Sequence, residues 1–161
     1  MVNSLLLGII AIAGTMLTII GAGIPLAKGI QAAAAAVAEK QRLNMFILIY
    51  LALAEALAIY GLLIAFIMYT KISPAINDAI ADVANPVLFT ETQAFIFLGA
   101  MAIMIISNLG AAITLTKGEP AAIGSLTANS EVFTPNLIYL GLGEALAIYG
   151  LLIAFILLNL A

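Results

Sequence analysis

The sequence predicts an all-α membrane protein in which four transmembrane helices form two tandem, parallel-repeated hairpins. The 161-residue chain is 65% apolar and only 8% charged, whereas a soluble domain carries about 25% charged residues. Four apolar stretches are long enough to cross a bilayer core about 30 Å thick, which takes roughly 20 helical residues. The second half of the chain also repeats the first. Because an open sheet would leave backbone groups unpaired in lipid, we expect the spans to be helices.

The composition excludes several classes of function. The chain contains no histidine and no cysteine, which rules out a cysteine nucleophile, a histidine base and a zinc finger. Its five basic residues are scattered along the chain, so they cannot form a nucleic-acid-binding surface. We therefore expect no metal site, no bound cofactor and no nucleic-acid partner.

The four predicted spans follow one another closely. The first apolar stretch covers residues 4–27, and an alanine-rich segment is expected to extend its helix to about residue 38. The other three stretches cover residues 43–70, 92–116 and 135–161.

Polar connections separate these spans. The first is the turn Glu39-Lys40-Gln41-Arg42, and the other two carry the proline and Asn/Asp clusters that mark chain breaks. The chain is accordingly divided into a first hairpin at 1–72, a connecting loop at 73–90 and a second hairpin at 91–161.

The positive residues in the connections predict the orientation. Lys28, Lys40 and Arg42 lie at or near the first loop, and Lys117 lies at the third, whereas the middle connection has only Lys71. Cytoplasmic loops carry an excess of Lys and Arg. We therefore expect the first and third loops in the cytoplasm and both termini outside.

An internal repeat is the strongest feature of the sequence. Residues 48–67, LIYLALAEALAIYGLLIAFI, recur as residues 137–156, LIYLGLGEALAIYGLLIAFI, at an offset of 89. They differ at two positions, where alanine in the first copy is glycine in the second. Since each half crosses the membrane twice, both halves have the same orientation, unlike the inverted repeats of many transporters.

The first helix of each hairpin carries a stripe of small residues. Its members recur at spacings of four and three in the first half: Ala11, Thr15, Thr18, Ala22, Pro25 and Gly29. Small residues let helices approach closely in lipid. The stripe indicates either a tightly packed inner layer or ordinary helix pairing within one chain.

Two acidic residues, Glu55 and Glu144, are the only acids inside the predicted apolar spans, each near the middle of its span. An ionised carboxylate at that depth costs roughly 2.5–3.5 kcal/mol on insertion scales. The group can become neutral by taking up a proton, or it can pair with a cation. A carboxylate that changes charge between lipid and a polar pathway carries one ion; the alternative is a structural hydrogen bond between helices.

The surroundings of the two carboxylates favour a proton. Their helical neighbours carry no side-chain oxygen. Tyr60 and Tyr149 lie five positions further on and could donate a hydroxyl to a carboxylate on the same or a neighbouring hairpin, or serve only in packing. Sodium needs several oxygen ligands to replace its hydration shell, whereas a proton needs the carboxylate and one partner. Sodium at the same glutamates is the alternative.

These features together resemble the proteolipid of V/A-type rotary ATPases, known as the K or c subunit. The resemblance covers essentially the whole chain. It consists of the duplicated hairpin, a small-residue first helix ending in Ala27-Lys28-Gly29, and a mid-membrane glutamate followed by Tyr-Gly at Tyr60-Gly61 and Tyr149-Gly150.

The resemblance implies a membrane rotor. Identical copies would form a ring in the bilayer, and Glu55 and Glu144 would take up ions from one half-channel of a stator a/I-type subunit and release them to the other. Tyr60 and Tyr149 would be the partners of the carboxylates. Central-stalk subunits would couple rotation to a soluble head that hydrolyses or synthesises ATP, and the chain alone would catalyse nothing.

The sequence departs from the family pattern in two ways. Many four-helix members keep the carboxylate in only one hairpin, whereas this chain keeps both and would carry two ions per copy. Members that bind sodium resemble one another in polar residues at positions that hold Leu26, Leu115, Ala56 and Ala145 in this chain. This favours protons. A competing interpretation is a non-rotary membrane channel or structural proteolipid, although a channel is expected to line its pore with several polar residues.

Overall fold

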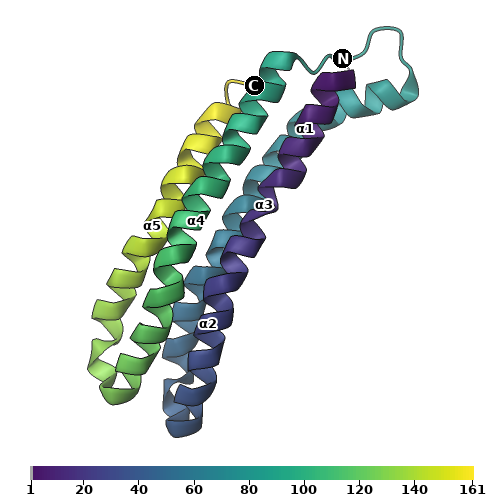
Figure 1. Cartoon of the computed structure of the whole chain (residues 1–161). Coiled ribbons are helices and arrows are strands. Elements are labelled where there is room, and N and C mark those ends of the chain that lie inside the picture. Colours follow the sequence, from purple (N-terminus) through teal and green to yellow (C-terminus); the bar gives the residue numbers. More distant parts are fainter. Residues whose placement is uncertain (1) are drawn as a thin grey trace.

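The computed structural model describes residues 2–161, in which every regular element is a helix. The long helices are α1 (Val2–Thr15), α2 (Thr18–Glu39), α3 (Asn44–Ala81), α4 (Glu91–Ala128) and α5 (Phe133–Leu158), and two 3₁₀ turns are η1 (Gln41–Leu43) and η2 (Ser130–Val132). Figure 1 shows long rods lying side by side, with both termini at the same end of the bundle.

Within the described residues, four helical segments are long and apolar enough to cross a membrane, which confirms the predicted number of spans. They are Asn3–Glu39, Gln41–Ala81, Glu91–Ala128 and Ser130–Leu158. The first span consists of α1 and α2 end to end.

The helices form two layers. The rod of α1 and α2 packs beside α4, and α3 packs beside α5. Within each hairpin, α2 packs on α3, and α4 packs on α5. The two hairpins therefore lie next to each other in the same order, with the first helix of each hairpin in one layer and the second in the other (Figure 1).

The small-residue stripe of the first span lies in the packed interior. All six of its members, from Ala11 to Gly29, are buried. In the second hairpin the corresponding stripe is buried only in part: Ala100, Met104 and Ala111 are buried, but Thr114 is exposed. The difference shows that the first hairpin is covered by the second, while part of the same face of the second hairpin is bare.

Two helices run further than the sequence predicts. The expected connecting loop at 73–90 is helical up to Ala81, and α4 continues through the expected third connection to Ala128, with Pro74 and Pro120 inside the helices. Proline removes one backbone donor but does not prevent a helix that tertiary packing favours. In these extensions Ala75 and Ile123 are buried in the core, which supplies that packing.

The first span, predicted as one continuous helix, breaks at Met16 and Leu17. The hydroxyl of Thr15 donates to the carbonyl of Ala11, and that of Thr18 donates to the carbonyl of Thr15, each at 2.8 Å. Threonine hydroxyls that bond to the preceding turn bend helices. The position matching Thr15 in α4 is Met104, which has no hydroxyl; α4 is unbroken, although the hydroxyls of Ser107 and Thr116 bond to the preceding turn there too.

Candidate functional site

The structure brings one tyrosine and one glutamate of the candidate site together. The hydroxyl of Tyr60 on α3 donates a hydrogen bond to Oε1 of Glu144 on α5. Glu144 is buried, with 8% of its surface exposed. Because α3 belongs to the first hairpin and α5 to the second, this contact joins the two hairpins in the apolar middle of the bundle.

The helical pattern of α5 places Glu144 in this interface. Leu140 and Ala147, four residues before and three after it, are both buried, and residues at these spacings lie on one face of a helix. Glu144 therefore occupies a core position of α5. A buried carboxyl without a partner would be destabilising, and the Tyr60 hydroxyl supplies that partner.

Steric crowding explains why a glycine follows each tyrosine of the candidate site. A Cβ atom at Gly61 would collide with Oγ1 and Cβ of Thr18, and one at Gly150 would collide with Oγ and Cβ of Ser107. Glycine at these positions thus lets the second helix of each hairpin approach the first closely. The Tyr-Gly pair fixes the tyrosine on a helix held tightly against its neighbour.

Glu55 and Tyr149, the other two predicted site residues, are not brought together within the chain. Glu55 is exposed on α3, and Tyr149 on α5 has 62% of its surface exposed. No described residue is a hydrogen-bond partner of either side chain. The two copies of a nearly identical segment therefore have different surroundings in one chain.

One buried acid was missed by the sequence reasoning. Glu119 lies inside α4 and is fully buried, although it falls in the predicted third connection, beyond the apolar span at 92–116. Neither carboxyl oxygen has a hydrogen-bond partner among the described residues. A Cβ atom at Gly29 would lie 2.6 Å from Oε2 and 2.5 Å from the side chain of Leu51, which places Glu119 between α2 and α3.

The reason that the sequence did not single out Glu119 is local. Gly118 and Pro120 flank Glu119, and their presence indicated a loop. The repeat offers the signal that could have found it: the position matching Glu119 in the first half is the apolar Ile30.

A second buried polar residue, Asn108 of α4, also lies between the hairpins. Its side-chain amide donates to the carbonyl of Leu57 on α3 at 3.0 Å, and its own carbonyl oxygen has no partner among the described residues. The matching residue in the first half is Ile19. The interface within the chain thus carries polar groups that are absent from the equivalent positions of the first hairpin.

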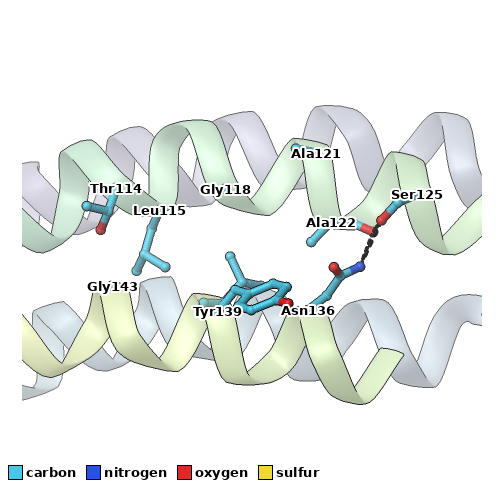
Figure 2. Close-up of a pocket in the computed structure, with 10 residues that line it drawn as sticks. Thr114, Leu115, Gly118, Ala121, Ala122, Ser125, Asn136, Tyr139 and Gly143 are labelled. Atoms are coloured by element: carbon cyan, nitrogen blue, oxygen red, sulfur yellow. Dashed lines mark hydrogen bonds between the residues drawn. The ribbon is translucent and has the colours of Figure 1, made fainter. Parts of the chain in front are cut away.

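A cavity of about 370 Å³ lies between α4 and α5 (Figure 2). Figure 2 shows residues of α4 on one side, among them Leu115 and Ala122, and Asn136 and Tyr139 of α5 on the other. The Asn136 amide donates to Oγ of Ser125 at 2.8 Å. No charged side chain lines the cavity.

The chemistry of the Tyr60–Glu144 pair suits a small cargo. The side-chain oxygens placed together are those of one carboxyl and one hydroxyl. Such a pair can hold a proton on the carboxyl, since the hydroxyl donates to one carboxyl oxygen and the other can carry the proton.

The whole sequence, including both hairpins, was compared with known protein families. The family of ATP synthase C subunits matches the chain twice, over residues 9–68 and 98–157. The two matches are offset by the same 89 residues as the internal repeat. No protein with curated annotation matches the chain significantly. The chain belongs to the ATP synthase C-subunit family, whose members are non-catalytic, ion-translocating membrane proteins of the ATP synthase rotor ring, and it joins two of the family's hairpins in one polypeptide.

Proposed function

We propose that this chain is the rotor-ring subunit of a V/A-type ATPase and carries protons on two mid-membrane carboxyl groups, Glu55 and Glu144. The observation that carries the proposal is the hydrogen bond between Tyr60 and Glu144 across the hairpins. The duplicated hairpin supports the V/A type, which the family match alone does not distinguish. The chain places the same Glu and Tyr-Gly pattern in each half.

The proposed cycle follows from the energetics of a carboxyl group in lipid. A neutral carboxylic acid at Glu144 can stay in the apolar interface, held by the Tyr60 hydroxyl. Opposite a polar half-channel of the stator the proton leaves, and the resulting carboxylate cannot return to lipid without a cost of roughly 2.5–3.5 kcal/mol. Rotation therefore proceeds only after the group is protonated again from the other half-channel.

The residues around Glu144 support a proton over sodium as the cargo. Tyr60 contributes the only hydroxyl that the described residues place on the carboxyl. Alanine and leucine occupy the positions where the sodium-binding pattern has polar side chains. Sodium requires several oxygens in place of its hydration shell, so it is the competing ion that an experiment must exclude.

Carbodiimide labelling of the detergent-solubilised ring tests the proposal, because the reagent attacks a protonated carboxyl in an apolar setting. We expect peptide mass analysis to find label on Glu55 and Glu144 that increases as pH falls and that sodium does not block. Protection by sodium would replace the proton with sodium and keep the rotor. Absence of label from both residues would overturn their role as carriers.

We also propose which partners meet which end of the ring. Lys40, beside η1, donates through Nζ to the carbonyl of Thr127 at the end of α4, so the two short turns lie at one end of the bundle. At the other end Gln93 donates to the carbonyl of Ala161 at 2.8 Å. With the first and third loops in the cytoplasm, the turn end would face the central stalk, while the stator would contact the α3–α5 layer.

The sidedness has a direct test, because the chain has no cysteine of its own. A single cysteine at Arg42 should be protected from a membrane-impermeant thiol reagent added outside intact cells, whereas one at Asn85 should react. The reverse pattern would invert the proposed orientation.

A further inference from the structure

One buried acid, Glu119 of α4, has no part in the proposed transport cycle. Its side chain is fully buried, and neither carboxyl oxygen has a hydrogen-bond partner among the described residues. The two proposed carriers differ from it, since Glu144 accepts a hydrogen bond from Tyr60 and Glu55 is exposed. Most buried polar groups in proteins are hydrogen-bonded, so a group that is not requires a physical explanation.

The carboxyl group of Glu119 lies in a close-fitting site between α2 and α3. A Cβ atom at Gly29 of α2 would lie 2.6 Å from Oε2 of Glu119 and 2.5 Å from Cδ2 of Leu51 on α3. A residue without a Cβ atom therefore leaves room for the carboxyl group at this point. At the matching position of the second hairpin, a Cβ atom on Gly118 would meet only the side chain of Leu140.

The face of α4 that carries Glu119 is otherwise apolar. Residues three or four positions apart lie on one face of a helix, and at these spacings Leu115, Ala122 and Ile123 are all buried. Their side chains contain no polar atom that could replace the water bound to a carboxylate. The surroundings of Glu119 therefore suit a neutral acid.

The helices around the site supply no charge or hydroxyl that compensates a carboxylate. All five basic residues of the chain are exposed, including Lys28 of α2 and Lys117 of α4. On α3 the hydroxyls of Tyr50 and Tyr60 both donate hydrogen bonds to α5, and Glu55 is exposed. A negative charge on Glu119 would therefore be buried and unpaired.

A buried carboxylate without a cation or a hydrogen bond is strongly destabilising, and taking up a proton removes the charge. We propose that Glu119 is a proton-binding site that keeps its proton while the carrier carboxyl groups exchange theirs, and that loss of this proton at alkaline pH loosens the packing of α4 against α2 and α3.

The burial of Glu119 explains why its proton stays in place. A carrier must meet both lipid and a polar pathway, and Glu55 is exposed while Glu144 retains 8% of its exposed surface. Glu119 retains none, because its own chain covers it completely. Water can reach the carboxyl group only when the helices separate locally, and such openings of a packed interface are rare. The proton is therefore a resident part of the contact between the hairpins.

The direction of the pH effect follows from proton binding. When α4 separates from its neighbours, the carboxyl group of Glu119 meets water and is ionised at neutral pH. The packed interface thus binds one more proton than the separated one. Stability falls as pH rises wherever the packed state binds more protons, so the contact between the hairpins should weaken as the solution becomes alkaline.

Infrared spectroscopy of the purified ring tests whether Glu119 is protonated, because the C=O stretch of a carboxylic acid is separate from the carboxylate bands. An E55Q/E144Q ring retains no carrier carboxyl, so the result does not depend on the proposed function. None of its other acids is buried, and they are expected to be ionised at neutral pH: Glu39, Asp78, Asp82, Glu91 and Glu131.

We expect the E55Q/E144Q ring to show a carboxylic-acid band at neutral pH that is lost in E55Q/E144Q/E119Q. The band should shift over minutes to hours after transfer to D₂O, as for a group exposed only by opening. Absence of the band from the E55Q/E144Q ring, or a shift complete on mixing, would overturn the proposal. E119I is a second variant for the case in which the glutamine ring does not assemble, and native mass establishes assembly.

The thermal dissociation of the ring tests the second half of the proposal. Between neutral and alkaline pH, the midpoint for the unaltered ring should fall several degrees further than that for E119Q, while lysines and tyrosines titrate in both. E131Q, which removes an exposed acid, is the matched control and should keep the pH dependence of the unaltered ring. Parallel curves for the unaltered ring and E119Q would overturn this half, and carbodiimide labelling of Glu55 and Glu144 would be unaffected by that result.

Discussion

Glu144 and Glu55 stand in nearly identical sequences but in different surroundings. Glu144 is buried and accepts a hydrogen bond from Tyr60, while Glu55 is exposed on the edge of the chain. Their helices differ at two positions within twenty residues. The difference therefore comes from what lies next to each hairpin, since the second hairpin covers one face of the first and no described residue covers the equivalent face of the second.

The largest expected effect comes from removing the carboxyl groups one at a time. Glu144→Gln and Glu55→Gln should each leave the ring folded, because glutamine keeps the shape and the acceptor oxygen of the side chain. Each should abolish most ion-coupled ATPase activity of the assembled complex, since an amide cannot release a proton. If one variant retained full coupling, the hairpin that carries its substitution would not carry ions. The two hairpins would then differ in function.

Adding a methyl group at Gly61 or at Gly150 should destabilise the ring. The two effects should be of similar size, because each glycine makes the equivalent close contact in its own hairpin. Gly61→Ala would force a Cβ against Thr18, and Gly150→Ala would force one against Ser107. Overpacking of this kind costs about 1–3 kcal/mol, measurable as a lower midpoint of thermal dissociation of the ring. Gly141→Ala is the control and should not destabilise, because nothing lies within 4 Å of its Cβ position and its repeat counterpart is already alanine, Ala52. Equal destabilisation by Gly141→Ala would contradict this account.

Glu119→Ile tests whether the carboxyl group buried between α2 and α3 destabilises the interface between the hairpins. Glu119 is fully buried with both oxygens unpartnered among the described residues, and an unsatisfied buried polar group costs about 1–3 kcal/mol. The substitution should therefore raise the thermal stability of the ring. A destabilised Glu119→Ile ring would indicate that the carboxyl has a favourable role in the assembled complex.

The smallest expected effect is that of removing one tyrosine hydroxyl, and it should be confined to one of the two carboxyl groups. Tyr60→Phe removes the hydroxyl that Glu144 accepts, and loss of one such hydrogen bond is worth about 1 kcal/mol. The carbodiimide reaction of Glu144 should change several-fold, while that of Glu55 in the same chain stays constant. A parallel change at Glu55 would show that the variant alters the whole ring and not one site.

Much of the fold could be predicted because it follows from local properties. The four spans follow from apolar length, and the repeat at an offset of 89 predicts two hairpins of equal orientation. The ends of α3 and α4 could not be predicted, because Pro74 and Pro120 indicate chain breaks locally and the packing of Ala75 and Ile123 overrides them. The break after Thr15 lies between two threonines whose hydroxyls bond to carbonyls of the preceding turn, and apolar periodicity does not report such bonds.

The sequence by itself determined the helical class, the duplication, and the two candidate carboxyl groups with a tyrosine five positions beyond each. Only the tertiary structure decided that Tyr60 meets Glu144, that Glu55 is left at an edge, and that Glu119 is buried between α2 and α3. The physical reason is that a repeated sequence assigns both hairpins the same faces. Which of those faces is covered depends on how the hairpins stack, and stacking brings together residues that are distant in the chain.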